Sequence, residues 1–179
     1  QEFRFYGIPP IEHHDDPKSR NDLHDRLEYL RNAEKYADVI LSAPNQSQLA
    51  IRPFHTFRVP VALDKFHMGC PQRLIPKVLH LPSYGPGKGT KYVMAVFSQL
   101  QKEGIAFEPH TPERLPFKEA INAYQEADIL VGQLLAPGGG KQEREVLACG
   151  KVVLTSMRYA SYPENIPPDC PIIDVNPDN

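Results

Sequence analysis

The sequence has little that would mark it for a membrane, for nucleic acid or for an oxidising compartment. No apolar run approaches the roughly 20 residues that a membrane-spanning helix needs, and nothing resembles a signal peptide. The formal net charge is only −2, whereas surfaces that bind nucleic acid or anionic lipid usually carry a basic excess. The three cysteines show no C-x-x-C spacing, so a disulfide framework or a cysteine metal site is poorly supported. We therefore expect a protein of the reducing cytoplasm, without a transmembrane segment and without a nucleic acid partner.

What is present suits a globular α/β protein. The 179 residues correspond to one domain of ordinary size or to one domain and part of a second, and 41% hydrophobic residues allow a sizeable core. The 19 prolines fall mostly between periodic segments, where they punctuate the fold and do not form a low-complexity tract.

Apolar runs alternate with helix-like segments in the second half of the chain. One segment places Val93, Val96, Phe97 and Leu100 on one helical face and ends at Gly104, which is typical of an amphipathic helix with a C-terminal glycine. Strands that are apolar throughout and alternate with helices predict a Rossmann-like parallel sheet covered on both faces. The predicted strands span 77–83, 105–111, 128–135, 151–156 and 171–176, and the predicted helices span 89–104, 116–127 and 141–149.

The first third of the chain is less regular and predicts the remnant of a second α/β domain. We expect a strand at 2–7, a helix at 21–37, a strand at 38–44 and a linker at 58–66, with a domain boundary between residues 64 and 76. These boundaries assign residues 1–66 to a partial first domain with its linker, and residues 76–179 to the Rossmann-like domain. Because the chain ends just after a predicted strand with no closing helix, we interpret the second domain as truncated.

A glycine run raises the first functional hypothesis. In "APGGGKQEREVLACGKVVL" (136–154), a predicted strand leads into three glycines and then into a helix. Ligands of parallel sheets bind outside the carboxyl ends of the strands, and free N–H groups of a first helical turn attract anions. Lys141 follows these glycines, and Lys88 in "YGPGKGT" stands at another predicted strand-to-helix turn. The two turns could hold a diphosphate, although neither matches a known phosphate-loop spacing, so ordinary turn chemistry is the open alternative.

Residues 25–176, with these two loops, resemble a known family. They are similar to the nucleotide-sugar-binding C-terminal domain of retaining glycosyltransferases of the GT-B architecture, family 4 (group 1) type. The matching segments are "VLHLPSYGPGKGTKYVMAVFSQLQKEG", "INAYQEADILVGQLL" and "REVLACGKVVLTS". The stretch "RVPVALDKF" resembles the linker between the two domains of that family. On this resemblance, residues 1–66 are part of the acceptor-side domain.

The resemblance implies roles for individual residues. Lys88 falls on the lysine that neutralises the donor diphosphate, and Glu145 falls on the second glutamate of the family's E-x7-E motif, which binds the ribose hydroxyls. The first motif position is Pro137, so Glu143 becomes the candidate to replace that glutamate. The implied catalytic residues are Lys88 and Glu145, and the donor-binding positions are Gly87, Gly89, Arg114, Leu115, Gly138, Gly139, Gly140, Lys141 and Glu143.

Several of these residues also have simpler interpretations. Glu143 alone is more typical of a solvent-facing helix residue, and His80 is more typical of a core histidine with its hydrogen bonds satisfied. Cys149 precedes the helix-ending Gly150 and is expected to be a buried structural thiol. The run "HHDD" (13–16) is expected to be a polar loop, because adjacent side chains diverge and metal ligands must converge.

The sequence thus predicts transfer of a sugar from a nucleoside diphosphate sugar to a carbohydrate, lipid or protein acceptor, with retention implied by the resemblance. No metal and no cofactor are expected beyond the donor substrate. The expected location is the cytoplasm, including the membrane periphery. Two alternatives stay open: a non-catalytic nucleotide-sugar-binding or scaffold module of the same fold, and a nucleotide-sugar epimerase of the same architecture.

Overall fold

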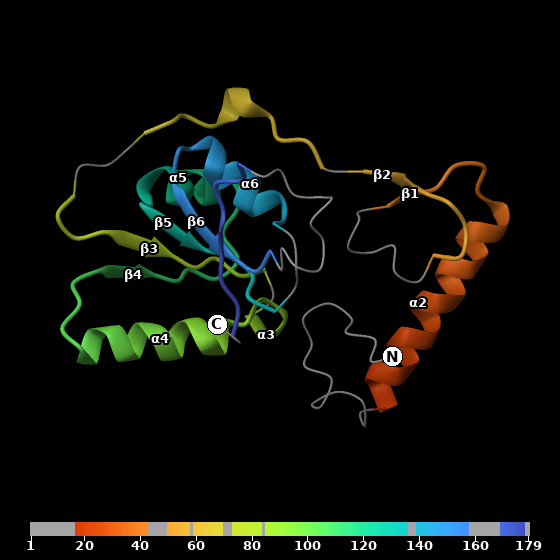
Figure 1. The fold of residues 1–179 in the computed structure, drawn as a ribbon, viewed down its shortest axis with the longest axis horizontal. Coiled ribbons are helices and arrows are strands. Elements are labelled where there is room, and N and C mark those ends of the chain that lie inside the picture. The colour runs from red at the N-terminus through yellow and green to blue at the C-terminus, as the bar shows by residue number, and fades with distance from the viewer. Residues whose placement is uncertain are drawn as a thin grey trace. The chain divides into compact units, whose positions relative to one another are not determined.

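The chain folds as two compact units that meet in sequence between Val59 and Pro60 (Figure 1). The computed structural model describes residues 17–42, 50–57, 59–69, 73–83, 85–135, 139–157 and 169–177. The strand predicted at residues 2–7 and the "HHDD" run lie outside these ranges.

The predicted linker, residues 58–66, is divided by the break between the units. Phe66 is buried in the main core of the second unit, and Val61 packs against that core. The short 3-10 helix η2 (Leu63–Lys65) lies between them in sequence. The second unit therefore begins upstream of the 64–76 boundary that we expected from the sequence.

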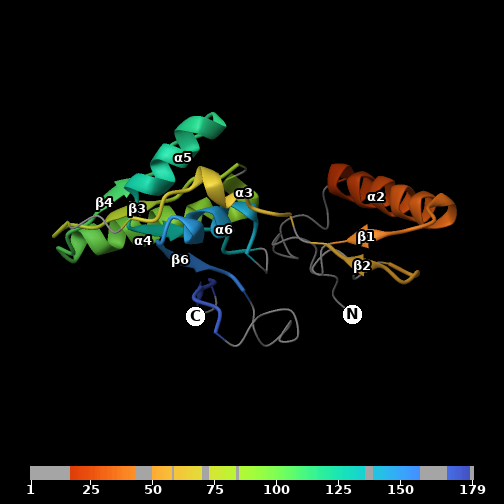
Figure 2. The same cartoon turned by 90° about the horizontal axis from the view of Figure 1, so that it is seen from above.

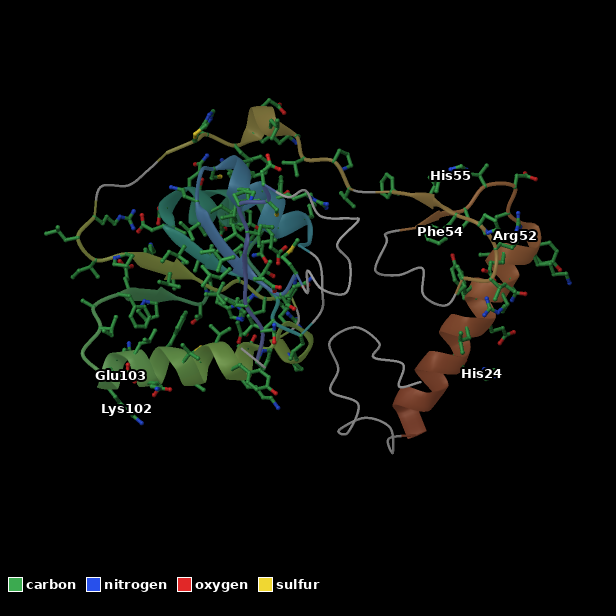
Figure 3. All side chains as sticks on the ribbon, in the orientation of Figure 1. His24, Arg52, Phe54, His55, Lys102 and Glu103 are labelled. Carbon is green, nitrogen blue, oxygen red and sulfur yellow. The ribbon has the colours of Figure 1, made fainter. Side chains whose placement is uncertain are left out.

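In the described part of the first unit, a long helix lies beside a pair of parallel strands (Figure 2). These elements are α2 (Pro17–Tyr36), β1 (Leu41–Ser42) and β2 (His55–Thr56). Glu34 of α2 is buried, and its carboxylate accepts hydrogen bonds from the backbone N–H groups of Ile51 (2.6 Å) and Arg52 (3.2 Å). The Arg52 guanidinium (labelled in Figure 3) also donates to the carbonyl oxygen of Ala37 at 2.9 Å. These bonds attach the segment before β2 to the C-terminal end of α2.

In the residues that the structure describes, the second unit has a five-stranded, all-parallel sheet in the order β4-β3-β5-β6-β7, accompanied by four helices. The strands are β3 (Lys77–Leu79), β4 (Glu108–His110), β5 (Ile129–Val131), β6 (Val152–Thr155) and β7 (Ile173–Asp174), and the helices are α3 (Gly85–Lys88), α4 (Thr90–Lys102), α5 (Phe117–Glu126) and α6 (Lys141–Ala148). This architecture confirms the predicted Rossmann-like α/β fold.

The sheet is covered on both faces, with α4 on one side of the strands and α5 and α6 on the other (Figure 1). Successive side chains of a strand point to opposite faces, and β3 shows the consequence. Val78 packs with Val93 and Phe97 of α4, whereas Leu79 packs in the cluster that contains Val146 of α6. The apolar character of the central strands therefore follows from burial on both faces, as predicted.

Glycine ends α4 at the position that the sequence predicted. Gly104 has a φ of 75°, in the left-handed region that a side chain disfavours. Its N–H donates to the carbonyl oxygen of Gln101 at 3.1 Å, and the N–H of Ile105 donates to that of Leu100 at 3.0 Å. This pair of bonds closes the last turn in the manner of a Schellman motif. Gly150, with a φ of 73°, follows α6 in the same conformation.

Candidate functional site

The candidate site lies at the edge of the sheet formed by the carboxyl ends of the strands, between β3 and β5, where the strand order reverses. These two strands are hydrogen-bonded neighbours, but β3 is followed by α4 on one face and β5 is followed by α6 on the other. The chain segments that leave the two carboxyl ends therefore diverge, which is the arrangement at which open α/β sheets bind ligands. The described residues that border this edge are 80–83 and 85–90 after β3, and 132–135 and 139–140 after β5. The sequence analysis selected residues in both segments.

His80 joins the two strands beneath this edge. Its side chain is 1% exposed, with Nδ1 2.8 Å from the carbonyl oxygen of Val131 and Nε2 2.9 Å from the hydroxyl of Thr90. Since a carbonyl oxygen only accepts, Nδ1 carries the proton and Nε2 accepts from the hydroxyl. Burial lowers the pKa of His80, and the charge of Lys88 lowers it further, against the opposing effect of the bond to Val131. Both ring nitrogens have partners within the protein, so His80 is the core histidine that the sequence favoured.

The turn after β3 packs directly on the loop after β5. Gly89 has a φ of 79°, and a Cβ at this position would lie 3.2 Å from Cβ of Leu134. The N–H of Leu134 donates to the carbonyl oxygen of Lys88 at 3.1 Å. The Lys88 ammonium donates to the side-chain Oε1 of Gln133 at 3.1 Å. In the part of the chain that the structure describes, Lys88 has no ion pair, so its charge is held at this edge by a neutral amide oxygen.

Gln133 connects the elements of the site, although the sequence analysis did not select it. Its backbone N–H donates to Oε1 of Glu143 at 3.3 Å. Its carbonyl oxygen accepts from the Thr155 hydroxyl and from the Ser156 N–H, both at 2.8 Å. The available signal was its place as the first polar residue after the apolar run 129–132.

Glu143 is completely buried, at 0% exposure, so the expectation that it faces solvent is wrong. Its carboxylate lies between two glycines: a Cβ at Gly132 would stand 2.5 Å from Oε1, and one at Gly140 would stand 2.8 Å from Oε2. Oε1 accepts from Gln133 N–H and lies 3.5 Å from the Thr155 hydroxyl, whereas Oε2 has no hydrogen-bond partner among the described residues. The residue is buried because the first turn of α6 packs over the carboxyl ends of β5 and β6, where only glycines leave room for it.

Glu145 and Lys141 lie on a different side of α6. Residues two apart in a helix project about 200° apart, so Glu143 and Glu145 leave the helix in nearly opposite directions. Glu145 is 4% exposed and pairs with the Lys141 ammonium at 3.2 Å. Lys141 also lies over the ring of Phe117 at 5.1 Å, beside α5. The structure therefore gives Lys88 and Lys141 different partners, and it brings Lys88 together with Gln133 and Glu143 through the loop after β5.

The glycines before α6 have mixed surroundings. Gly138 and Pro137 lie outside the described residues. Gly139 is half-buried, and its N–H donates to Sδ of Met157 at 3.2 Å. Gly140 caps α6 with extended backbone and no side-chain cap, which leaves the first-turn N–H groups without a side-chain acceptor at the cap.

The predicted base-binding loop follows the carboxyl end of β4. Arg114 is exposed with a φ of 51°, a conformation that is uncommon for residues other than glycine. Leu115 packs against the main core and anchors this loop. Gly87 lies in the short helix α3, next to Lys88.

Cys149 is fully buried, and burial raises the pKa of its thiol, as expected of a structural cysteine. No group of three or more His, Cys, Asp or Glu side chains that could hold a metal ion occurs among the described residues. Within the same ranges, no helix is both long enough and apolar enough to cross a membrane.

The sequence matches no known protein-family model, and a search of the curated proteins finds no similar sequence. The function is therefore inferred from the site itself.

Proposed function

We propose that the second unit binds a nucleoside diphosphate sugar at the carboxyl ends of β3 and β5 and transfers the sugar to an acceptor. One observation carries this proposal: the Lys88 ammonium stands at the open edge of the sheet, held by the Gln133 amide oxygen and by no carboxylate within the described residues. A phosphate charge about 4 Å from an ammonium near a protein surface interacts with it by about 4 kcal/mol. The backbone turns at Gly89 and Gly140 add N–H groups at the starts of α4 and α6, where anions are favoured.

The proposed reaction breaks the bond between the anomeric carbon of the sugar and the diphosphate oxygen. The acceptor oxygen forms a new bond to that carbon and loses its proton to a phosphate oxygen of the leaving group or to water, and the nucleoside diphosphate leaves with the bonding electrons. Negative charge grows on the departing phosphate during this step. A preorganised cation such as Lys88 stabilises that charge more in the transition state than in the bound donor, and this difference accelerates the transfer. The acceptor is a carbohydrate, a lipid or a protein, and the proposed location is the cytoplasm or the membrane periphery.

Donor binding is tested by thermal unfolding and calorimetry with uridine and guanosine diphosphates and their sugars. A ligand at 100 times its dissociation constant stabilises the folded state by about 2.7 kcal/mol. We expect stabilisation of this size with the diphosphate and sugar nucleotides of one of the two bases. We expect Lys88→Ala to weaken their binding by about tenfold or more. The matched control is Lys102→Ala, because Lys102 is exposed at the far end of α4 (Figure 3). Absence of binding to every donor at millimolar concentration, or equal loss in both lysine variants, contradicts the proposal.

Measurement of product formation distinguishes a transferase from a non-catalytic binding module. The non-catalytic alternative is favoured by Pro137, which stands at a position that the resemblance assigns to a sugar-binding glutamate. Lys88-dependent donor binding without release of nucleoside diphosphate, tested over a panel of acceptors, would support that alternative. Release of nucleoside diphosphate together with a glycosylated product supports transfer, and an altered sugar without transfer identifies an epimerase.

A further inference from the structure

The side chain of Gln133 holds the Lys88 ammonium, and the backbone of Gln133 is fixed at both its N–H and its carbonyl oxygen. The N–H donates to the Glu143 carboxylate at 3.3 Å. The carbonyl oxygen accepts from the Thr155 hydroxyl and from the Ser156 N–H, both at 2.8 Å. The side chain that reaches Lys88 therefore extends from a backbone that α6 and the end of β6 have already ordered.

The same loop also holds the main chain of Lys88. The Leu134 N–H donates to the Lys88 carbonyl oxygen at 3.1 Å, while the Lys88 ammonium donates to Oε1 of Gln133 at 3.1 Å. Leu134 is buried and packs with Val78 and Phe97 in the core cluster beside α4. Two consecutive residues thus bind both ends of this lysine. A long side chain that is already held loses less conformational freedom when a ligand binds to it.

The partner that holds Lys88 is neutral, whereas the partner that holds Lys141 is charged. An ammonium has three N–H donors, and an amide oxygen takes one of them without cancelling the charge. A carboxylate in the same place forms an ion pair, with which an incoming phosphate must compete. Lys141 is in this second situation, since its ammonium lies 3.2 Å from the Glu145 carboxylate. The two lysines selected from the sequence therefore differ in whether a carboxylate of the described residues compensates their charge.

We infer that Gln133 is a positioning residue for the proposed donor site: it orders the Lys88 ammonium at the carboxyl ends of β3 and β5 and leaves its charge available to the diphosphate. This inference rests on the proposed binding of a nucleoside diphosphate at Lys88. Gln133 acts through Lys88 and needs no contact with the ligand. Removal of the amide oxygen and its replacement by a carboxylate should both weaken diphosphate binding, the first by releasing the ammonium and the second by compensating its charge.

The test measures the affinity for uridine and guanosine diphosphates by calorimetry in two variants at position 133. Gln133→Leu removes the acceptor, and we expect binding about fivefold weaker, because the ligand must then order the lysine side chain itself. Gln133→Glu keeps an acceptor of the same size but adds a negative charge, and we expect binding about tenfold weaker or more. The matched control is Gln101→Glu on the exposed surface of α4, which should change the affinity by less than about twofold.

The melting temperature distinguishes a positioning role from a purely structural one. If Gln133 served only the fold, affinity and stability would fall together in both variants. Gln133→Glu can still bind the Lys88 ammonium, so its melting temperature should stay within about 3 °C of wild type although its affinity falls. A Gln133→Glu protein that does not fold, or that loses stability in proportion to affinity, overturns the inference. If Gln133→Leu does not fold, Gln133→Glu decides the matter.

A double-variant cycle shows whether Gln133 acts through Lys88. In the Lys88→Ala background, which already binds the diphosphate more weakly, Gln133→Leu should change the affinity by less than about twofold. An equal loss with and without Lys88 overturns the inference. Wild-type affinity in both variants at position 133, together with a loss in Lys88→Ala, contradicts this inference alone. If wild type binds neither the diphosphates nor their sugars, the proposed function fails, and this inference fails with it.

Discussion

Replacement of Gly132 by alanine tests the packing of the Glu143 carboxylate. The φ of Gly132 lies outside the left-handed region, so the backbone itself accepts alanine. The new Cβ, however, would stand 2.5 Å from Oε1 of Glu143 and 2.9 Å from Oγ1 of Thr155, and real Cβ atoms do not approach other atoms so closely. The carboxylate must therefore move away from the Gln133 N–H.

The expected cost has two parts. Forcing an extra methyl group into a packed site costs about 1–3 kcal/mol. Loss of a hydrogen bond to a charged group costs about 1.5–3 kcal/mol, part of which relaxation recovers. We expect Gly132→Ala to lower the free energy of unfolding by about 2–4 kcal/mol, which corresponds to at least about 4 °C in the melting temperature of a chain of this size.

The measurement is urea and thermal unfolding of Gly132→Ala, Glu143→Ala and the double variant. In the double variant most of the clash is gone, so its cost should fall below the sum of the single costs by about 1 kcal/mol or more. Gly69→Ala is the control, because a Cβ at Gly69 would meet nothing within 4 Å and should change stability by no more than about 0.5 kcal/mol. A Gly132→Ala protein as stable as wild type, or strictly additive costs, would refute this description of the carboxylate.

Three further predictions concern the second unit. The pKa of His80 is lowered from 6.5 in the folded protein, so at acidic pH the unfolded chain binds a proton more readily than the folded chain does. The free energy of unfolding should therefore fall as the pH drops below about 6.5. Denaturation at stepped pH should show a flatter pH profile for His80→Asn than for wild type. Phe97→Ala removes a buried ring whose centroid lies 5.2 Å from that of Phe107 and should cost about 3–5 kcal/mol in urea unfolding, whereas Phe117→Ala, at a ring 48% exposed, should cost much less. Burial raises the pKa of Tyr124 to about 12, and the charge of Glu145 adds to this effect. Subtracting the ultraviolet absorbance titration of Tyr124→Phe from that of wild type should leave a transition with its midpoint near pH 12. A midpoint near pH 10 would contradict the buried position.

Local sequence patterns were sufficient for the elements of the fold. The spacing of Val93 and Phe97 predicted helix α4, and Gly104 marked its end, because helical periodicity and glycine conformation act over a few residues. The nearly all-apolar segment 128–135 predicted a buried strand, and β5 lies within it. The one-turn helix α3 in "GPGK" was not predicted, since glycine and proline there read as a plain turn.

Which residues meet at the candidate site could be learned only from the tertiary structure. Lys88 and Gln133 are 45 residues apart, and they meet only because β5 pairs with β3 instead of with β4. The burial of Glu143 follows from the way α6 packs over the ends of β5 and β6, which no helical pattern encodes. Lys141, by contrast, found a partner within its own helix turn at Glu145. The amino-acid sequence alone thus determined the parallel α/β architecture and the two glycine turns, because those depend on near neighbours. Strand order, a property of the folded chain, decided which side chains from those turns stand together.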